Sequence, residues 1–164
     1  RLIKEMESKG YEFEGADASF ELLVRRLRGD LEQQFTIDGF RIFIDSREGE
    51  MDSEASIKVR NQNGAVEHTA SDGNGPVNAL DHALRKALDK FFPSLRNVRL
   101  TDYKVRVLDE KSATAASVRV LIRSTNGKSS WTTVGVSENV IGASLIALVD
   151  SLEYALIKMK ENKP

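Results

Sequence analysis

The chain has 164 residues, of which 40% are hydrophobic and 30% are charged, and this predicts one compact domain with a smaller appendage. A formal net charge of -1, with no long run of lysine or arginine, argues against nucleic acid as a partner. The lack of cysteine excludes disulfides and thiolate chemistry, and no apolar run is expected to span a bilayer, so we expect a cytoplasmic protein with no membrane partner.

Residues 1–30 have the apolar spacing of two short helices. The first is expected from Leu2 to Ser8, and the second from Ala16 or Asp17 to Arg28. Asp17 is a candidate N-cap, and Gly29 is typical of a helix C-terminus. The chain begins inside a helical pattern without a methionine, so we expect it to be a piece of a longer protein, with residues 1–30 as a separate helical subdomain.

Residues 31–93 change to the period of two that is typical of strands. A first strand is expected from Gln34, with a bulge at Gly39. The next two strands are expected around Ile57 and Val66, on either side of the hairpin signal Asn63-Gly64. A helix is then expected from Pro76 to Phe91, because its apolar residues recur at helical spacing and a proline follows.

Residues 94–164 repeat this order at an offset of about 64 positions. Strands are expected at 100–108, 118–122 and 131–136, followed by a helix from Ile141 to Met159. The predicted fold class is therefore α+β, with one domain of two pseudo-symmetric βββα units over residues 31–164. The units cover about 31–93 and 94–164, and residues 1–30 precede them.

Signals for catalysis are weak. The two histidines, His68 and His82, lie at no metal-ligand spacing, and we expect His82 to be a surface or helix-packing residue. The serines form no nucleophile elbow with a placed base. We therefore expect no catalytic residue and no metal site in this chain.

Signals for ligand binding are stronger. Residues 71–78, Ser-Asp-Gly-Asn-Gly-Pro-Val-Asn, are rich in glycine and immediately precede a helix. Their spacing fits neither a dinucleotide fingerprint nor a P-loop. Because a helix N-terminus presents unpaired N–H groups, a carboxylate or phosphate could bind there; the alternative is an ordinary turn and cap. At the matching place in the second unit, Glu138 would discourage an anion. Asp102 and Tyr103 fit either a plain strand edge or a ligand contact.

Four stretches together resemble the C-terminal part of citramalate synthases and 2-isopropylmalate synthases. They are Gly10-Tyr11-x-Phe13-Glu14-Gly15-Ala16-x-Ala18-Ser19-Phe20-Glu21-Leu22-Leu23, Gly73-Asn74-Gly75-Pro76-Val77-Asn78-Ala79-Leu80, Leu100-x-Asp102-Tyr103-Lys104-Val105-Arg106-Val107-Leu108, and residues 131–141 with Ala143-Ser144. The first and last stretches favour the citramalate branch.

The resemblance implies a regulatory and dimerisation domain cut from its enzyme. In that family a TIM barrel with a divalent metal condenses acetyl-CoA with a 2-oxo acid, which makes the full-length protein an acyltransferase. A helical linker follows, and then two βββα units that form a homodimer and bind the end product of the pathway. This chain is accordingly expected to lack condensing activity and cofactors, since the metal and acetyl-CoA belong to the barrel.

The resemblance also implies an amino-acid effector: isoleucine in the citramalate branch and leucine in the isopropylmalate branch. Carried over by motif, the candidate effector site comprises Gly75, Val77, Asn78, Leu100, Tyr103, Val107, Val118, Ile141 and Ala143. Asn78 stands where some relatives have aspartate, so carbonyl groups or Asp81 are expected to receive the ammonium group. The loop from Lys111 to Ala116 departs from the glycine-led turn of relatives, which leaves the lid of the site unassigned.

Two other interpretations of the chain's function stay open at this point. The chain could be an oligomerisation module without a ligand, or a small enzyme in its own right. If the regulatory reading holds, a few kcal/mol of differential affinity for one arrangement of the units would suffice for inhibition. Residues 1–30 are then expected to transmit the effect.

Overall fold

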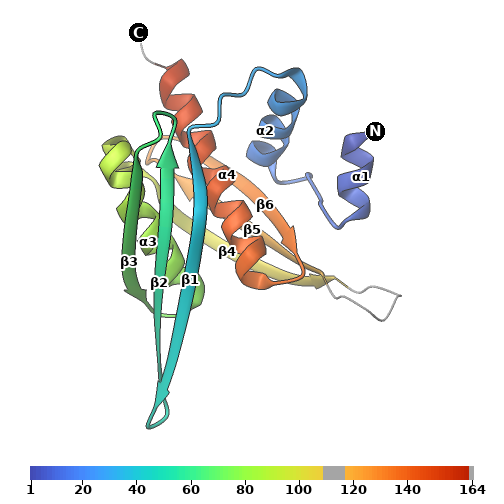
Figure 1. Cartoon of the computed structure of the whole chain (residues 1–164). Coiled ribbons are helices and arrows are strands. Elements are labelled where there is room, and N and C mark those ends of the chain that lie inside the picture. Colours follow the sequence, from blue (N-terminus) through green and yellow to red (C-terminus); the bar gives the residue numbers. More distant parts are fainter. Residues whose placement is uncertain (109–116, 163–164) are drawn as a thin grey trace. The chain divides into compact units, whose positions relative to one another are not determined.

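The computed structural model describes residues 1–108 and 117–162. The chain divides into two compact units, one of Glu32–Arg96 and one of Arg1–Leu31 together with Asn97–Pro164. Each unit contains a three-stranded antiparallel sheet and a long helix that follows it in the sequence (Figure 1). The predicted α+β class with two βββα units is therefore confirmed.

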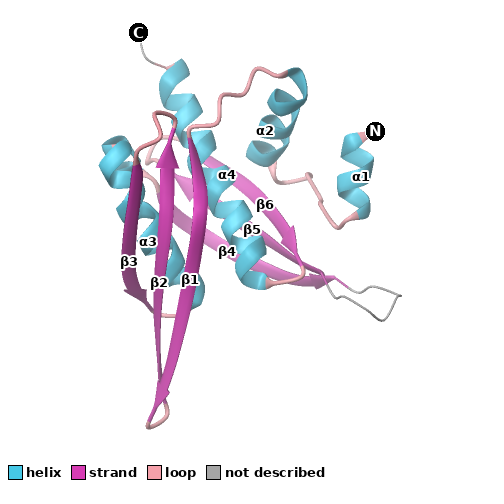
Figure 2. Ribbon diagram, in the orientation of Figure 1, coloured by secondary structure: helices cyan, strands magenta, loops and turns pink. Residues whose placement is uncertain are grey.

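The unit of Glu32–Arg96 has the strand order β1-β2-β3, with its helix over one face of the sheet (Figure 2). Its elements are β1 (Phe35–Arg47), β2 (Glu50–Asn61), β3 (Val66–Gly73) and α3 (Pro76–Phe91). The bulge in β1 falls between Ile37 and Gly39, as expected. Pro76 occupies the start of α3, where its missing N–H costs nothing.

The core of this unit follows from the alternation along β2. Ala55, Ile57 and Val59 are buried on the face that α3 covers, and the residues between them are more exposed. From the helix, Leu80 and Leu84 are fully buried against this face. Removing this apolar surface from water is the main force that holds α3 on the sheet.

The other βββα unit has the strand order β4-β5-β6. Its elements are β4 (Arg99–Leu108), β5 (Ser117–Thr125), β6 (Ser130–Ser137) and α4 (Val140–Glu161), and a short 3-10 helix η1 (Pro93–Asn97) precedes them. The turn after β5 carries Gly127 at φ 90, as the Asn-Gly signal predicts. The turn η1 is not apparent from the periodicity.

Two matching hydrogen bonds support the internal repeat. In the first unit the Thr69 hydroxyl donates to the Ala83 carbonyl at 2.7 Å, and in the second the Thr133 hydroxyl donates to the Ala147 carbonyl at 2.8 Å. Both bonds run from the third strand to the following helix over 14 positions. The repeat therefore preserves the way in which the helix is fixed to its sheet.

The N-terminal helices are α1 (Leu2–Ser8) and α2 (Asp17–Arg28), and α2 packs against α4 and β6. Gly29 ends α2 in the left-handed conformation, at φ 72, as predicted. The prediction that Asp17 is the N-cap is wrong, since Ala16 holds that position. Asp17 lies in the first turn, where its carboxylate accepts the N–H of Thr132 at 3.1 Å.

Helix α4 is long and apolar enough to cross a membrane, by length and composition alone. The expectation that no segment has this character is therefore wrong. Most of the apolar stretch is buried within the protein, and Leu148 and Leu152 are fully buried. A helix that is apolar on most sides is also typical of a protein core, and the burial favours this interpretation.

Candidate functional site

The loop before α3 is shaped by two glycines. A side chain on Gly73 would place its Cβ 2.3 Å from the backbone nitrogen of Ala79, so the loop can approach the helix only with glycine there. Gly75 has φ 129 and is the residue at the N-cap position of α3. No side chain caps this helix among the described residues. Its first N–H groups are consequently a candidate anion-binding feature of this unit.

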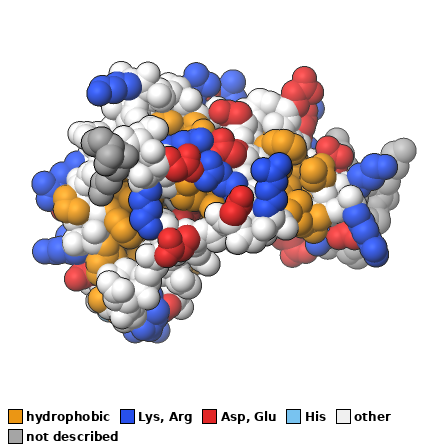
Figure 3. Space-filling model, turned by 90° about the horizontal axis from the view of Figure 1, so that it is seen from above, with side chains coloured by type: hydrophobic (Ala, Val, Ile, Leu, Met, Phe, Trp, Pro, Cys, Tyr) orange, Lys and Arg blue, Asp and Glu red, His pale blue; other side chains and the backbone are white. Residues whose placement is uncertain are grey.

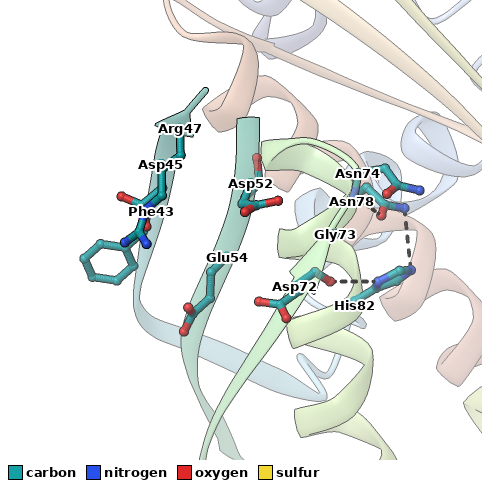
Figure 4. Close-up of a pocket in the computed structure, with 11 residues that line it drawn as sticks. Phe43, Asp45, Arg47, Asp52, Glu54, Asp72, Gly73, Asn74, Asn78 and His82 are labelled. Atoms are coloured by element: carbon teal, nitrogen blue, oxygen red, sulfur yellow. Dashed lines mark hydrogen bonds between the residues drawn. The ribbon is translucent and has the colours of Figure 1, made fainter. Parts of the chain in front are cut away.

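Asn78 fastens the loop to the helix. Its Oδ1 accepts the N–H of Asn74 at 2.9 Å, so its Nδ2 is turned toward Nε2 of His82, 3.5 Å away. The other ring nitrogen of His82 lies 3.2 Å from the carbonyl oxygen of Asp72 (Figure 4). An amide nitrogen can only donate and a carbonyl can only accept, so a neutral His82 with its proton on Nδ1 satisfies both contacts.

An open pocket of about 740 Å³ lies beside this loop, within the same unit. Its lining includes four carboxylates from three strands, Asp45, Asp52, Glu54 and Asp72, and one guanidinium group, that of Arg47. Figure 4 shows these side chains along the sheet, with Asn74, Asn78 and His82 at the α3 end. The pocket therefore joins a helix start, which favours an anionic group, to a surface on which the four carboxylates outnumber the one arginine and which favours a cationic group. Those two charges are the charges of an amino acid.

The candidate residues of the other unit lie on β4, β5 and the first turn of α4. Val107 and Val118 are directly opposite in the β4-β5 ladder. The Tyr103 hydroxyl lies 2.7 Å from the Ser144 hydroxyl, next to Ala143 in the chain. The structure thus brings together Val107 with Val118, and Tyr103 with the start of α4.

The start of α4 is chemically different from the start of α3. The Asn139 side chain accepts the N–H of Ile141 at 2.7 Å, and the Ser137 hydroxyl accepts the N–H of Asn139 at 3.3 Å. Glu138 is exposed at the same place. Two donors are already used and a carboxylate is near, so this helix start is the weaker anion site.

Of the nine candidate residues, three belong to the unit Glu32–Arg96 and six to the other. Gly75, Val77 and Asn78 lie at the start of α3; Leu100, Tyr103 and Val107 on β4; Val118 on β5; and Ile141 and Ala143 in the first turn of α4. Their assignment to one effector site stays a prediction. Asp81, suggested for the ammonium group, is buried and paired with Arg85 at 2.9 Å. The loop Lys111 to Ala116 lies outside the described residues.

Sequence reasoning missed the docking of α2 on the outer edge of β6. The Ser19 hydroxyl accepts the N–H of Val134 at 2.9 Å and donates to Oδ2 of Asp150 at 3.0 Å. Together with the bond from Asp17 to Thr132, this gives the edge strand the partners that a further strand would otherwise supply. In the sequence, the one signal of this docking is that Ser19, a small polar residue, lies within the apolar face of the predicted helix.

Asp150 is the buried charge of this contact. Burial raises the pKa of its carboxyl group, while Arg26 at 3.1 Å and the Ser19 hydroxyl act in the opposite direction. The segment before α2 is held as well, because Arg119 donates to the carbonyl of Gly10 at 2.8 Å and pairs with Glu12 at 3.0 Å. Residues 10–26 are therefore bound to β5, β6 and α4 through polar side chains.

Within residues 1–108 and 117–162, no three histidine, aspartate or glutamate side chains form a group suited to a metal ion. On the face shown in Figure 3, positive and negative side chains are interspersed with hydrophobic ones. That face has no extended surface of one sign, in agreement with the net charge of -1.

The two βββα units belong to a known class of allosteric regulatory domain, as a comparison with protein families shows. Residues 14–156 match the LeuA allosteric (dimerisation) domain, and the chain belongs to this family. The resemblance read from the sequence is confirmed, and the chain is a regulatory and dimerisation domain.

Relatives with high identity over nearly the whole chain are enzymes of the citramalate branch. The chain is 56% identical to an (R)-citramalate synthase of Geobacter sulfurreducens and 53% identical to one of Aquifex aeolicus, in both cases over 97% of the chain. A 2-isopropylmalate synthase of Aquifex aeolicus is 32% identical over 63% of the chain. The chain spans about 30% of the length of these citramalate synthases and 18% of the isopropylmalate synthase.

Proposed function

We propose that this chain is the effector-binding domain of a citramalate synthase and that its effector is isoleucine, which inhibits the enzyme by feedback. The observation that carries the proposal is the difference between the two branches. Identity to (R)-citramalate synthases is 56% over 97% of the chain, whereas identity to a 2-isopropylmalate synthase is 32% over 63%.

The chemistry of the candidate residues suits such a ligand. The uncapped start of α3 offers N–H groups to a carboxylate, and the acidic pocket beside it offers partners to an ammonium group. In the other unit, Val107, Val118 and Tyr103 present apolar surface of the kind that a branched side chain requires. Each unit by itself thus offers part of what a free amino acid requires.

Calorimetric titration of the purified chain with isoleucine, leucine and valine tests the proposal. We expect isoleucine to bind at least tenfold more tightly than the other two, because one misplaced methyl group costs about 1–3 kcal/mol in a fitted apolar pocket. Tighter binding of leucine would favour the alternative, a regulatory domain of a 2-isopropylmalate synthase. No detectable heat of binding with any of the three amino acids would favour an oligomerisation module without a ligand.

The activity of the full-length protein follows as a further part of the proposal. We propose an acyltransferase in which a separate barrel of the same chain holds the divalent metal and acetyl-CoA, in the cytoplasm. The present chain is then a non-catalytic and cofactor-free part of it. Purified chain incubated with acetyl-CoA and pyruvate should release no coenzyme A; turnover would instead support the small-enzyme reading.

We also propose that residues 1–30 transmit the effector signal. The supporting contacts are those of residues 10–26 with β6 and α4, because the first turn of α4 carries two of the candidate residues, Ile141 and Ala143. A ligand can shift this contact only by its difference in affinity between two arrangements. Hydrogen exchange in residues 1–30 of the full-length enzyme should therefore change at saturating isoleucine, and unchanged exchange would contradict transmission through this segment.

A further inference from the structure

The side-chain amide of Asn78 is held between a loop and a histidine ring. Its Oδ1 accepts the N–H of Asn74 at 2.9 Å, and its Nδ2 lies 3.5 Å from Nε2 of His82, one turn further along α3. The two ends of an amide have opposite hydrogen-bonding character, since the oxygen accepts and the nitrogen donates. Both contacts of Asn78 are therefore made only while Nε2 of His82 is an acceptor.

The other side of the ring determines where its proton lies. Nδ1 of His82 is 3.2 Å from the carbonyl oxygen of Asp72, which can only accept (Figure 4). A neutral imidazole carries one proton, and the hydrogen bond of one ring nitrogen decides which nitrogen holds it. The Asp72 carbonyl thus keeps the proton on Nδ1 and leaves Nε2 to accept from Asn78. All of these residues belong to the unit Glu32–Arg96.

Protonation of the ring is incompatible with this arrangement. In the imidazolium form both ring nitrogens donate, so Nε2–H would face the Nδ2 donor of Asn78. Rotation of the amide by a half turn would give the ring an acceptor, but it would also turn Nδ2 toward the N–H of Asn74. In either orientation two donors face each other and one hydrogen bond is lost. Asn78 can therefore satisfy the loop and the ring together only when His82 is neutral.

Charged side chains of both signs surround the ring. From the three strands, they are residues that line the same pocket as His82: Asp45, Arg47, Asp52, Glu54 and Asp72. On α3, Lys86 donates to the carbonyl of Ala70 at 3.1 Å. Asp81 and Arg85 on the same helix are paired with each other. Among these side chains and His82, imidazole is the type that ordinarily changes charge between pH 5 and 8, so a pH change in that range acts here chiefly through the histidine.

We propose that His82 is a proton-controlled positioning residue for the start of α3. In its neutral form it sets the amide of Asn78 so that the preceding loop is held against the helix, and its protonation releases the loop. This part rests on the geometry of one unit alone. A second consequence, weaker isoleucine binding at acidic pH, rests on the proposed function, because Asn78 and the uncapped N–H groups of α3 contact an effector only if that function holds.

Nitrogen-15 NMR of the purified chain tests the proposal, and only two histidines contribute to the ring spectra. At about pH 8, His82 should carry its proton on Nδ1. His68 makes no hydrogen bond through its ring within the described residues, so it should favour the proton on Nε2, as free histidine does. When the pH is lowered to about 5.5, the backbone N–H of Asn74 and the side-chain amide of Asn78 should shift together with the His82 ring. A proton on Nε2 of His82 at about pH 8 would overturn the proposal.

His82→Gln is the conservative variant, because glutamine offers Asn78 an acceptor and takes up no proton in this range. Its Asn74 N–H should show no transition between the two pH values. The matched control His68→Gln should keep the wild-type transition. A transition of the Asn74 N–H that persists in His82→Gln would also overturn the proposal, since another group would then cause it.

Calorimetric titration with isoleucine at the same two pH values measures the second consequence. We expect binding to be about three- to tenfold weaker at the lower pH in wild type, as for one lost hydrogen bond, and nearly unchanged in His82→Gln. Equal pH dependence in both proteins would refute the link between His82 and the effector. If isoleucine binds at neither pH, the proposed function fails, while the NMR result still decides whether His82 positions Asn78.

Discussion

The side chain of Asn78 holds the loop before α3 by accepting the N–H of Asn74. Asn78→Ala removes this acceptor, and we expect the free energy of unfolding to fall by about 1 kcal/mol. Isoleucine affinity should also fall, because the helix start that offers N–H groups would loosen. Urea denaturation and calorimetry measure the two effects. Asn74→Ala keeps the backbone N–H donor and is the control. Equal losses of stability and affinity in the two variants would contradict the role given to the Asn78 side chain.

The buried carboxyl group of Asp150 should make the stability of the folded chain depend on pH. Burial raises the pKa of its carboxyl group, so the folded chain holds this proton more tightly than the unfolded chain. Its stabilising contribution is present below the unfolded pKa of about 3.8 and is lost as the pH rises through the folded pKa. We therefore expect the free energy of unfolding of Asp150→Asn to rise relative to that of wild type as the pH is raised from about 4 to about 7, as denaturation at each pH would measure.

Asp89 provides the control of opposite sign. The hydrogen bond from Arg96 lowers the pKa of Asp89, so its contribution is present above the unfolded pKa of about 3.8 and is lost as the pH falls. Asp89→Asn should therefore lose stability relative to wild type as the pH rises. Parallel curves for the two variants would contradict the assignment of Asp150 as a desolvated carboxyl group.

At the scale of elements, Ser19 fastens α2 to the edge of β6. Ser19→Ala leaves the buried N–H of Val134 without its partner and removes one hydrogen bond to Asp150. We expect a loss of about 1–3 kcal/mol in stability and faster hydrogen exchange at the Val134 amide. Ser8→Ala, which removes an exposed bond inside α1, should change stability by less than about 0.5 kcal/mol. An equally small effect at Ser19 would show that α2 is not fastened there.

Close approach of β6 and α4 depends on Gly135. A Cβ at this position would lie 2.0 Å from the carbonyl oxygen of Ala143, which is backbone and cannot turn away. Gly135→Ala should cost about 1–3 kcal/mol or more, because strand and helix must separate. Isoleucine binding should weaken too, since Ala143 is a candidate site residue. Thermal unfolding compares it with Gly39→Ala, where a Cβ meets nothing within 4 Å; equal stability of both variants would contradict the close packing.

At the scale of the whole molecule, an effector that binds only the folded chain must stabilise it. Isoleucine at a hundred times its dissociation constant should raise the free energy of unfolding by about 2.7 kcal/mol. For a chain of this length that corresponds to about 5–10 °C in the unfolding temperature. Leucine at the same concentration should shift it by less. A larger rise in the unfolding temperature with leucine than with isoleucine would instead favour the isopropylmalate branch.

The regulatory role also concerns the whole assembly. Effector binding and association are linked if the ligand prefers one dimer arrangement, and the linkage is then equal in both directions. If isoleucine is the effector, it should therefore change the dimer dissociation constant of the wild-type chain, and sedimentation over a dilution series measures this change.

Much of the fold could be predicted because it is encoded locally. Alternation of apolar residues predicts each strand, the Asn-Gly pairs predict the β2-β3 and β5-β6 hairpins, and Pro76 and Gly29 predict helix ends within a residue. The 64-residue offset predicts the pair of βββα units, and four sequence stretches predict the family. Each of these signals depends on residues that are close in the chain.

Other features were decided only by tertiary structure. The bond from Ser19 to Val134 joins residues 115 positions apart, and no local pattern encodes such a partner. Asp17 looked like a cap because an acid before a helix usually caps it, yet the edge of β6 offered its carboxylate a different donor. Likewise, the composition of α4 fits a membrane span or a core helix equally well, and only its burial by the rest of the protein distinguishes the two.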